Sequence, residues 1–297
     1  MKPHTQVGRL LLVGIALLAF SASACAAQAP EREGPEDRAR RLLAQPNPLA
    51  ASNSVWIEEL TYMEVRDRIA AGATTAIVPT GGIEENGPFL ATGKHNYILE
   101  AICPVLVHKL GNALCAPIVP FVPEGNIDPP SGAMYFPGSI SVRDTTYVAL
   151  LEDIGASLKQ HGFRDIVFIG DSGGNQRGMG QAAESLNERW RDSGVRAHFI
   201  EAFYTPGWEE TEKHTEEVLG VKEGTNDGHH DDIWVTAMMM VTDPETVRHR
   251  QRIDAGLASI NGVDIADADA TIELGRRMID FRAAYTAVAI RQAIAAD

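Results

Sequence analysis

Short apolar runs alternate along this chain with longer segments in which apolar residues recur every three or four positions. The short runs are rich in β-branched residues and predict buried strands at 75–79, 115–121, 165–169 and 195–201. The periodic segments predict helices at 62–70, 96–110 and 145–162, from 176 to about 191, and at 267–295. Strands that alternate with helices predict a three-layer α/β fold, with a mostly parallel central sheet covered on both faces.

Two segments carry clear local signals. Thr61 and Glu64 have the spacing of a capping box, which predicts the start of a helix. The segment 123–141 contains so many proline and glycine residues that it predicts a long loop without regular structure. Loops of this length inside a compact domain usually have a function.

The N-terminus has the pattern of a secretory signal peptide. Lys2 and Arg9 precede an apolar run at 10–20, and small residues follow it. The run is shorter than the roughly 20 residues that a membrane-spanning helix needs, and no later segment comes close, so we expect no membrane span. We expect cleavage near residue 27 and export, in a bacterium to the periplasm. Cys25 leaves lipoprotein anchoring as an alternative.

The pattern divides the chain into three regions, which are a signal peptide at 1–27, a flexible leader at 28–50 and one α/β domain at 51–297.

The formal net charge of -14 disfavours nucleic acid and anionic membranes as partners, and is compatible with a small neutral or cationic substrate. Cys103 and Cys115 do not have the spacing of a metal finger. Two buried thiols or a disulfide both fit them.

Candidate ligands of a divalent metal gather in the glycine-rich segment 79–96, directly after a predicted strand. Glu84, Glu85 and His95 supply carboxylate and imidazole groups, which suit such an ion. A loop at the end of a buried strand is where α/β proteins place their chemistry. The alternative is that the glutamates are solvated loop charges and that His95 caps the next helix.

Two further polar clusters stand at predicted strand-to-helix junctions. Asp171 and Ser172 follow a strand within a glycine-rich turn, where an aspartate is also ordinary turn chemistry. His230 and Asp231 precede an apolar run, and imidazole is a common proton carrier and metal ligand. An N-cap is the simpler role for an aspartate at such a place. The shared placement of all three clusters favours one common site.

These segments, in this order, resemble the creatininase (creatinine amidohydrolase) family. The resemblance covers about 61–244 and rests on PTGGIEENGP with His95 eleven residues after Glu84, FPGSIS at 136–141, FIGDSGGN at 168–175 and the stretch 230–244. It implies a layered α/β fold with a divalent metal centre that hydrolyses cyclic or linear amide C–N bonds. It also implies a homo-oligomer, often a hexamer.

Residue by residue, the chain departs from the family at the metal centre. Glu84 matches the glutamate ligand, His95 stands where a bridging aspartate is usual, and His230 matches a histidine assigned to catalysis. Four other family groups are replaced, namely three histidine ligands by Asn86, Phe89 and Ser172, and a glutamate by Val235. These replacements argue against a centre with two metal ions.

The groups that remain predict a mononuclear, metal-assisted hydrolysis of an amide. The predicted ligands of one Zn or Mn ion per chain are Glu84, His95, Asp171 and, as a further ligand, Asp231. His230 is the predicted general acid or base. Glu85 and Ser172 are the other catalytic candidates.

Two other functions also fit the sequence. Ser172 as nucleophile with His230 as base would make the chain a serine hydrolase. A relative that has lost its metal centre would only bind a ligand or another subunit. Phe203, Tyr204 and Trp208 fit either the wall of a substrate pocket or packing beneath a loop.

Overall fold

The computed structural model describes residues 33–296 and divides the chain into two units. The first unit, up to Gln45, contains one helix, α1 (Pro35–Leu43), none of whose residues is buried. This helix lies within the segment that the sequence analysis assigned to a flexible leader. The predicted signal peptide lies outside the described residues.

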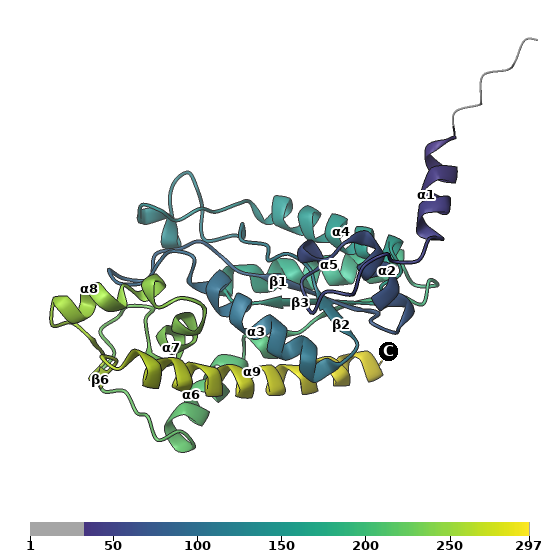
Figure 1. The fold of residues 1–297 in the computed structure, drawn as a ribbon. Coiled ribbons are helices and arrows are strands. Elements are labelled where there is room, and N and C mark those ends of the chain that lie inside the picture. The colour runs from purple at the N-terminus through teal and green to yellow at the C-terminus, as the bar shows by residue number, and fades with distance from the viewer. Residues whose placement is uncertain (1–32, 297) are drawn as a thin grey trace, which may run out of the picture. The chain divides into compact units, whose positions relative to one another are not determined.

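A four-stranded parallel sheet forms the centre of the second unit, which begins at Pro46 (Figure 1). Thr75 of one central strand pairs with Asp165 of the other, and Thr80 pairs with Gly170, so these two strands end at the same level. Their following loops therefore begin side by side. In sheet order the strands are β2 (Ala113–Cys115), β1 (Thr75–Thr80), β3 (Asp165–Gly170) and β4 (Arg196–Phe199).

Helices cover both faces of this sheet, because successive side chains of the strands point to opposite faces. Ile77 packs into one apolar cluster, whereas its neighbours Ala76 and Val78 pack into a second. The first cluster lies against α3 (Lys94–Leu110), α7 (Ile233–Thr242) and α9 (Ala268–Ala296), and the second against α2 (Tyr62–Ala70), α4 (Asp144–Gln160) and α5 (Gln176–Arg189). The predicted three-layer α/β fold is thus confirmed.

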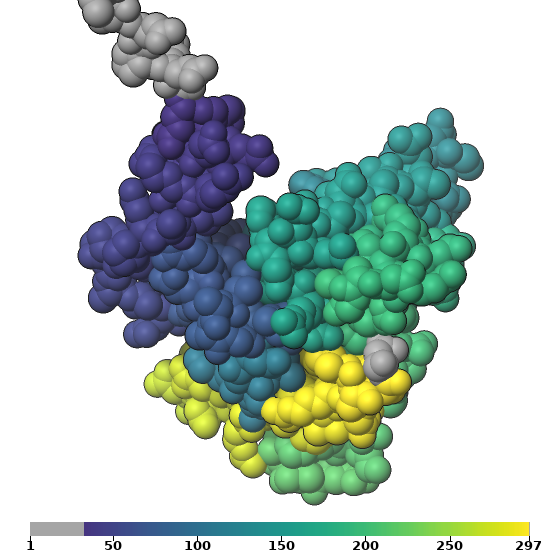
Figure 2. Space-filling view, turned by 90° about the vertical axis from the view of Figure 1, so that its right-hand side faces the viewer, coloured from purple at the N-terminus to yellow at the C-terminus, as the bar shows by residue number. Residues whose placement is uncertain are grey.

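The remaining elements are short. They are α6 (Gly207–Glu217), α8 (His249–Asp254), the antiparallel pair β5 (Ser259–Ile260) and β6 (Val263–Asp264), and 3₁₀ helices at Ile57–Glu59, Gly132–Tyr135, Gly173–Asn175, Glu201–Phe203 and Pro244–Val247. Both α3 and α6 pack against α9, whose yellow residues reach the surface beside them in Figure 2. Among residues 33–296, none of the helices combines the length and the apolar character that crossing a membrane requires.

The capping box at the start of α2 is confirmed. The backbone N–H of Glu64 donates to Oγ1 of Thr61 at 3.3 Å, and the carboxylate of Glu64 accepts from the backbone N–H of Thr61 at 2.8 Å. Each side chain therefore satisfies a backbone donor that the first turn of a helix leaves free.

Several predicted boundaries are wrong, among them the end of the strand expected at 195–201, which stops at Phe199. The strand expected at 115–121 is β2 at Ala113–Cys115, because Pro117 and Pro120 have no N–H to donate to a neighbouring strand. Helix α3 begins at Lys94, two residues before its expected start. His95 therefore stands in the first turn of a helix and not in the loop that precedes it.

Candidate functional site

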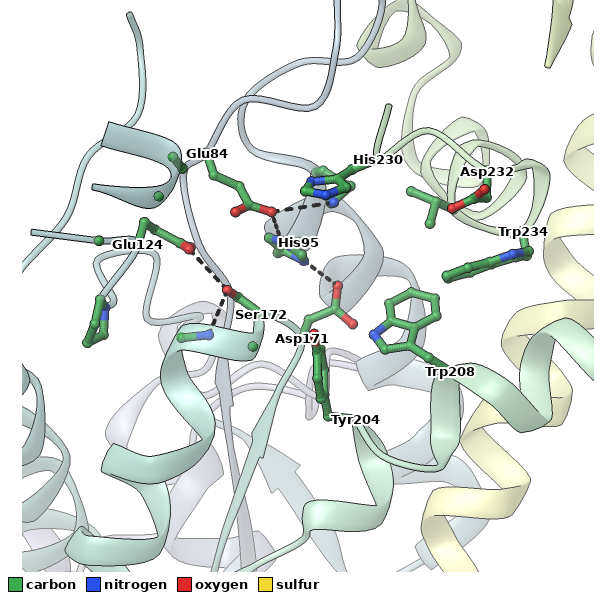
Figure 3. A pocket seen from close by; sticks show the side chains of 18 residues that line it. Glu84, His95, Glu124, Asp171, Ser172, Tyr204, Trp208, His230, Asp232 and Trp234 are labelled. Carbon is green, nitrogen blue, oxygen red and sulfur yellow. Dashed lines mark hydrogen bonds and ion pairs between the residues drawn. The ribbon is translucent and has the colours of Figure 1, made fainter. Parts of the chain in front are cut away.

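A cavity of about 590 Å³ opens at the carboxyl edge of the sheet (Figure 3). Its lining comes from the loops after β1, β3 and β4, from the loop 123–141, and from the starts of α3, α6 and α7. The structure thus brings together five of the predicted site residues, which are Glu84, His95, Asp171, Ser172 and His230.

His95 lies between two carboxylates, and each of its ring nitrogens contacts one of them (Figure 3). Its Nε2 is 2.7 Å from Oε1 of Glu84, and its Nδ1 is 2.8 Å from Oδ2 of Asp171. Burial and the charge of Lys94 lower the pKa of His95, but the two carboxylates outweigh them and raise it above its ordinary value. Burial raises the pKa of Glu84, but His95 and Lys94 together lower it to about 2.

Each of these carboxylates also contacts a buried cation. The ammonium Nζ of Lys94 is 3.5 Å from Oε1 of Glu84, and Nη2 of Arg282 is 2.9 Å from Oδ1 of Asp171. Burial raises the pKa of Asp171, yet Arg282 and His95 outweigh burial and hold that pKa below its ordinary value. Arg282 comes from the middle of α9, 111 positions after Asp171 in the sequence (282 − 171).

Glu124 is the functional candidate that the sequence analysis missed. Its Oε2 accepts a hydrogen bond from Oγ of Ser172 at 3.1 Å, and its Oε1 is buried without a hydrogen-bond partner among the described residues. Burial and the charge of Glu84 raise the pKa of Glu124 to about 7. One signal could have found it, since Glu124 is a carboxylate at the start of the long loop that follows a buried apolar segment.

Aromatic side chains form one wall of the cavity. Tyr204 and Trp208 follow β4 and line the cavity, which is one of the two roles that the sequence left open for them, whereas Phe203 packs in the first apolar cluster. Trp234 comes from the first turn of α7. The rings of Trp208 and Trp234 lie 4.5 Å apart between centroids. His230 is exposed and stands at the cavity beside Glu84 (Figure 3).

Two predicted site residues do not line the cavity. The carboxylate of Glu85 accepts a hydrogen bond from the backbone N–H of Gly87 at 3.1 Å, which closes a turn of its own loop. Asp231 is buried, and the charges nearest to it include those of Asp227 and Arg252. Asp232, its neighbour, faces the cavity instead.

The arrangement of donors does not fit a divalent metal ion. Within residues 33–296, no group of three or more His, Cys, Asp or Glu side chains is placed to hold one. Both ring nitrogens of His95 contact carboxylates, whereas an imidazole ligand must offer a nitrogen lone pair to the metal. Glu84 and Asp171 each contact a cation already. As arranged, these side chains bind one another.

The chain matches known proteins of one family. The family model described as creatinine amidohydrolase (creatininase) matches residues 58–290. A creatinine amidohydrolase of Pseudomonas putida is 29% identical over 118 residues, which are 40% of this chain and 45% of the relative. A mycofactocin precursor peptide peptidase of Mycolicibacterium smegmatis is 29% identical over 123 residues, which are 40% of this chain and 47% of the relative. In each match the chain spans less than half of the relative's length.

Solved creatininases have the same fold. A mutant creatininase complexed with creatine matches with a TM-score of 0.60 and 20% identity, over 81% of this chain and 98% of that chain. A creatininase of the Zn–Zn type and one in a Mn form match with the same score, identity and coverage. The structures that share this fold therefore include zinc and manganese forms.

Proposed function

Because the chain belongs to the creatininase family, we propose that it is a hydrolase of amide C–N bonds in a small cyclic or linear amide. The observation that carries the proposal is the carboxyl group of Glu124 in the cavity, next to Ser172 and Glu84. A pKa of about 7 allows this group both to take up and to release a proton near neutral pH.

In this proposal Glu124 acts as the general base. It takes a proton from a water molecule that attacks the amide carbonyl, while Ser172 holds the carboxyl group through its hydrogen bond. His230, at the cavity wall, donates the proton that the leaving nitrogen needs. The aromatic wall with Trp208 and Trp234 excludes water from the rest of the substrate.

The metal-activated water that the resemblance implies is not part of this proposal, because the donors do not fit a metal ion. The sequence analysis expected one Zn or Mn ion per chain, and metal analysis of the purified protein decides between that expectation and a site without metal. Export to the periplasm and a homo-oligomeric state stay predictions.

A second candidate function is favoured by the same hydrogen bond. With Oγ of Ser172 3.1 Å from Oε2 of Glu124, the serine would be the nucleophile and Glu124 its base, in place of the expected His230. A phosphonyl group on Ser172 after reaction with a fluorophosphonate, or an acyl group after reaction with an activated ester, would favour this route in the mass spectrum. An unlabelled but active enzyme would contradict it.

The test is a turnover assay with a panel of lactams and linear amides. We expect the isosteric Glu124→Gln to lose 10²- to 10⁴-fold in kcat, since general-base catalysis typically contributes that much. The control is Glu188→Gln, an exposed glutamate on α5 that should retain full activity. Full activity of Glu124→Gln would refute the role of Glu124. No turnover of any amide by the wild type would instead favour a relative that only binds its ligand.

A further inference from the structure

Two of the carboxylates of the site are each paired with a buried side-chain cation. Glu84 and Asp171 carry two negative charges, and Lys94 and Arg282 carry two positive charges within 3.5 Å and 2.9 Å of them. Two positive charges are also what one divalent ion would supply. A buried charge is costly unless it is paired, and each of these four charges has a partner of opposite sign without a further ion.

Lys94 occupies a position that local structure does not favour. It is the first residue of α3 and only 5% exposed, and a cation at a helix N-terminus opposes the helix dipole. Its contact with Glu84 compensates for this unfavourable placement. The side chain lines the cavity next to His95, at the centre of the predicted ligand set.

Arg282 is held in place more tightly still. It is fully buried, and its guanidinium lies 3.5 Å from the ring centroid of Trp208 and 4.2 Å from that of Phe203. Its Nη2 also donates to the backbone carbonyl of Phe203 at 2.9 Å. Aromatic faces attract a guanidinium, so this cage fixes the positive charge beside Asp171.

We infer that Lys94 and Arg282 together take the place of a divalent metal ion in this chain, so that the site is assembled and stable without any metal. A divalent ion would bring two additional positive charges next to Glu84 and Asp171, which are already paired with cations. It would also have to displace His95 from Glu84 or from Asp171. Charge repulsion and the loss of these contacts both oppose its binding.

The experiment is metal analysis and thermal unfolding of the purified protein, without substrate. The wild type, incubated with zinc or manganese and then desalted, should hold fewer than about 0.1 ions per chain, and EDTA should not change its melting temperature. If it holds about one ion, and a hundredfold excess over Kd raises the melting temperature by roughly 5 to 10 °C, the inference is overturned.

Two variants test the exchange of cation for metal directly. Lys94→Met removes the ammonium next to Glu84 and should increase zinc binding at least tenfold over the wild type. Lys109→Met, which removes a more exposed lysine near the end of the same helix, should not change zinc binding. Equal zinc binding by Lys94→Met and the wild type would refute the role of Lys94. The inference does not rest on hydrolysis, because metal content and melting temperature are independent of any activity.

Discussion

Removal of the Arg282 guanidinium should strongly destabilise the protein. Arg282→Met leaves Asp171 fully buried without its cation, and breaking a buried ion pair in this way costs about 3–5 kcal/mol. His95 still contacts Asp171, which reduces the loss. The lost hydrogen bond to Phe203 and the lost stacking on Trp208 increase it. We therefore expect a loss of about 4 kcal/mol in the free energy of unfolding.

The assay is urea unfolding of a double-mutant cycle. When Asp171→Asn is combined with Arg282→Met, neither member of the pair leaves an unpaired charge behind. The double variant should therefore lose less free energy of unfolding than the two single variants lose together, by at least about 1 kcal/mol. Arg276→Met on the same helix is the control, because its exposed pair with Glu273 should contribute no more than about 0.5 kcal/mol. A loss below about 1 kcal/mol for Arg282→Met, or strict additivity in the cycle, would refute the reasoning.

Three further predictions concern single positions. Burial and Glu84 raise the pKa of Glu124 to about 7. The protonated carboxyl group therefore contributes fully to stability below pH 4.5, and this contribution is lost as the pH rises through 7. Glu124→Gln should abolish this loss of stability, as measured by urea unfolding at pH 5 and at pH 7.5. Thr61→Ala removes the cap of α2 and should lower the free energy of unfolding by about 1 kcal/mol, read from the urea midpoint. Gly174→Ala should lower the melting temperature, because a β-carbon there overlaps the backbone carbonyl of Pro123, whereas Gly180→Ala has room and should not.

The order of the four sheet strands and of helices α2, α3, α4, α5 and α9 was predictable because local patterns determine it, whereas α7, which covers one face of the sheet, was not predicted. The strands at 75–79 and 165–169 were identified to within a residue at each end, since each is a short, mostly apolar run that helical periodicity does not fit. The same strands also predicted that Glu84 and Asp171 would meet, because parallel neighbours end at one edge of the sheet. The bounds of β2 failed because two prolines interrupt an otherwise apolar run.

The partners of the site residues were not predictable, because each comes from a distant segment. Arg282 lies on the buried face of the amphipathic helix α9. The sequence pattern predicts core residues on this face, and it does not show which carboxylate a buried arginine there would contact. Glu124 lies in the long loop 123–141, and hydrophobic periodicity does not predict where the side chains of a loop lie in space. Lys94 was overlooked because the expected helix began two residues too late. Charge compensation across a cavity is a property of the tertiary structure, and no local pattern encodes it.

The order β2-β1-β3-β4 has a consequence for where any chemistry in this fold must occur. From β1 the chain runs through α3 to β2, on one side of β1. From β2 it returns through α4 to β3, on the other side of β1. The connections therefore diverge between β1 and β3, and such a topological switch point opens a crevice beyond the strand ends. The connectivity of the backbone creates this crevice, independently of the side chains that fill it. Evolution can therefore exchange the groups at this place for others of different chemistry without having to move the site.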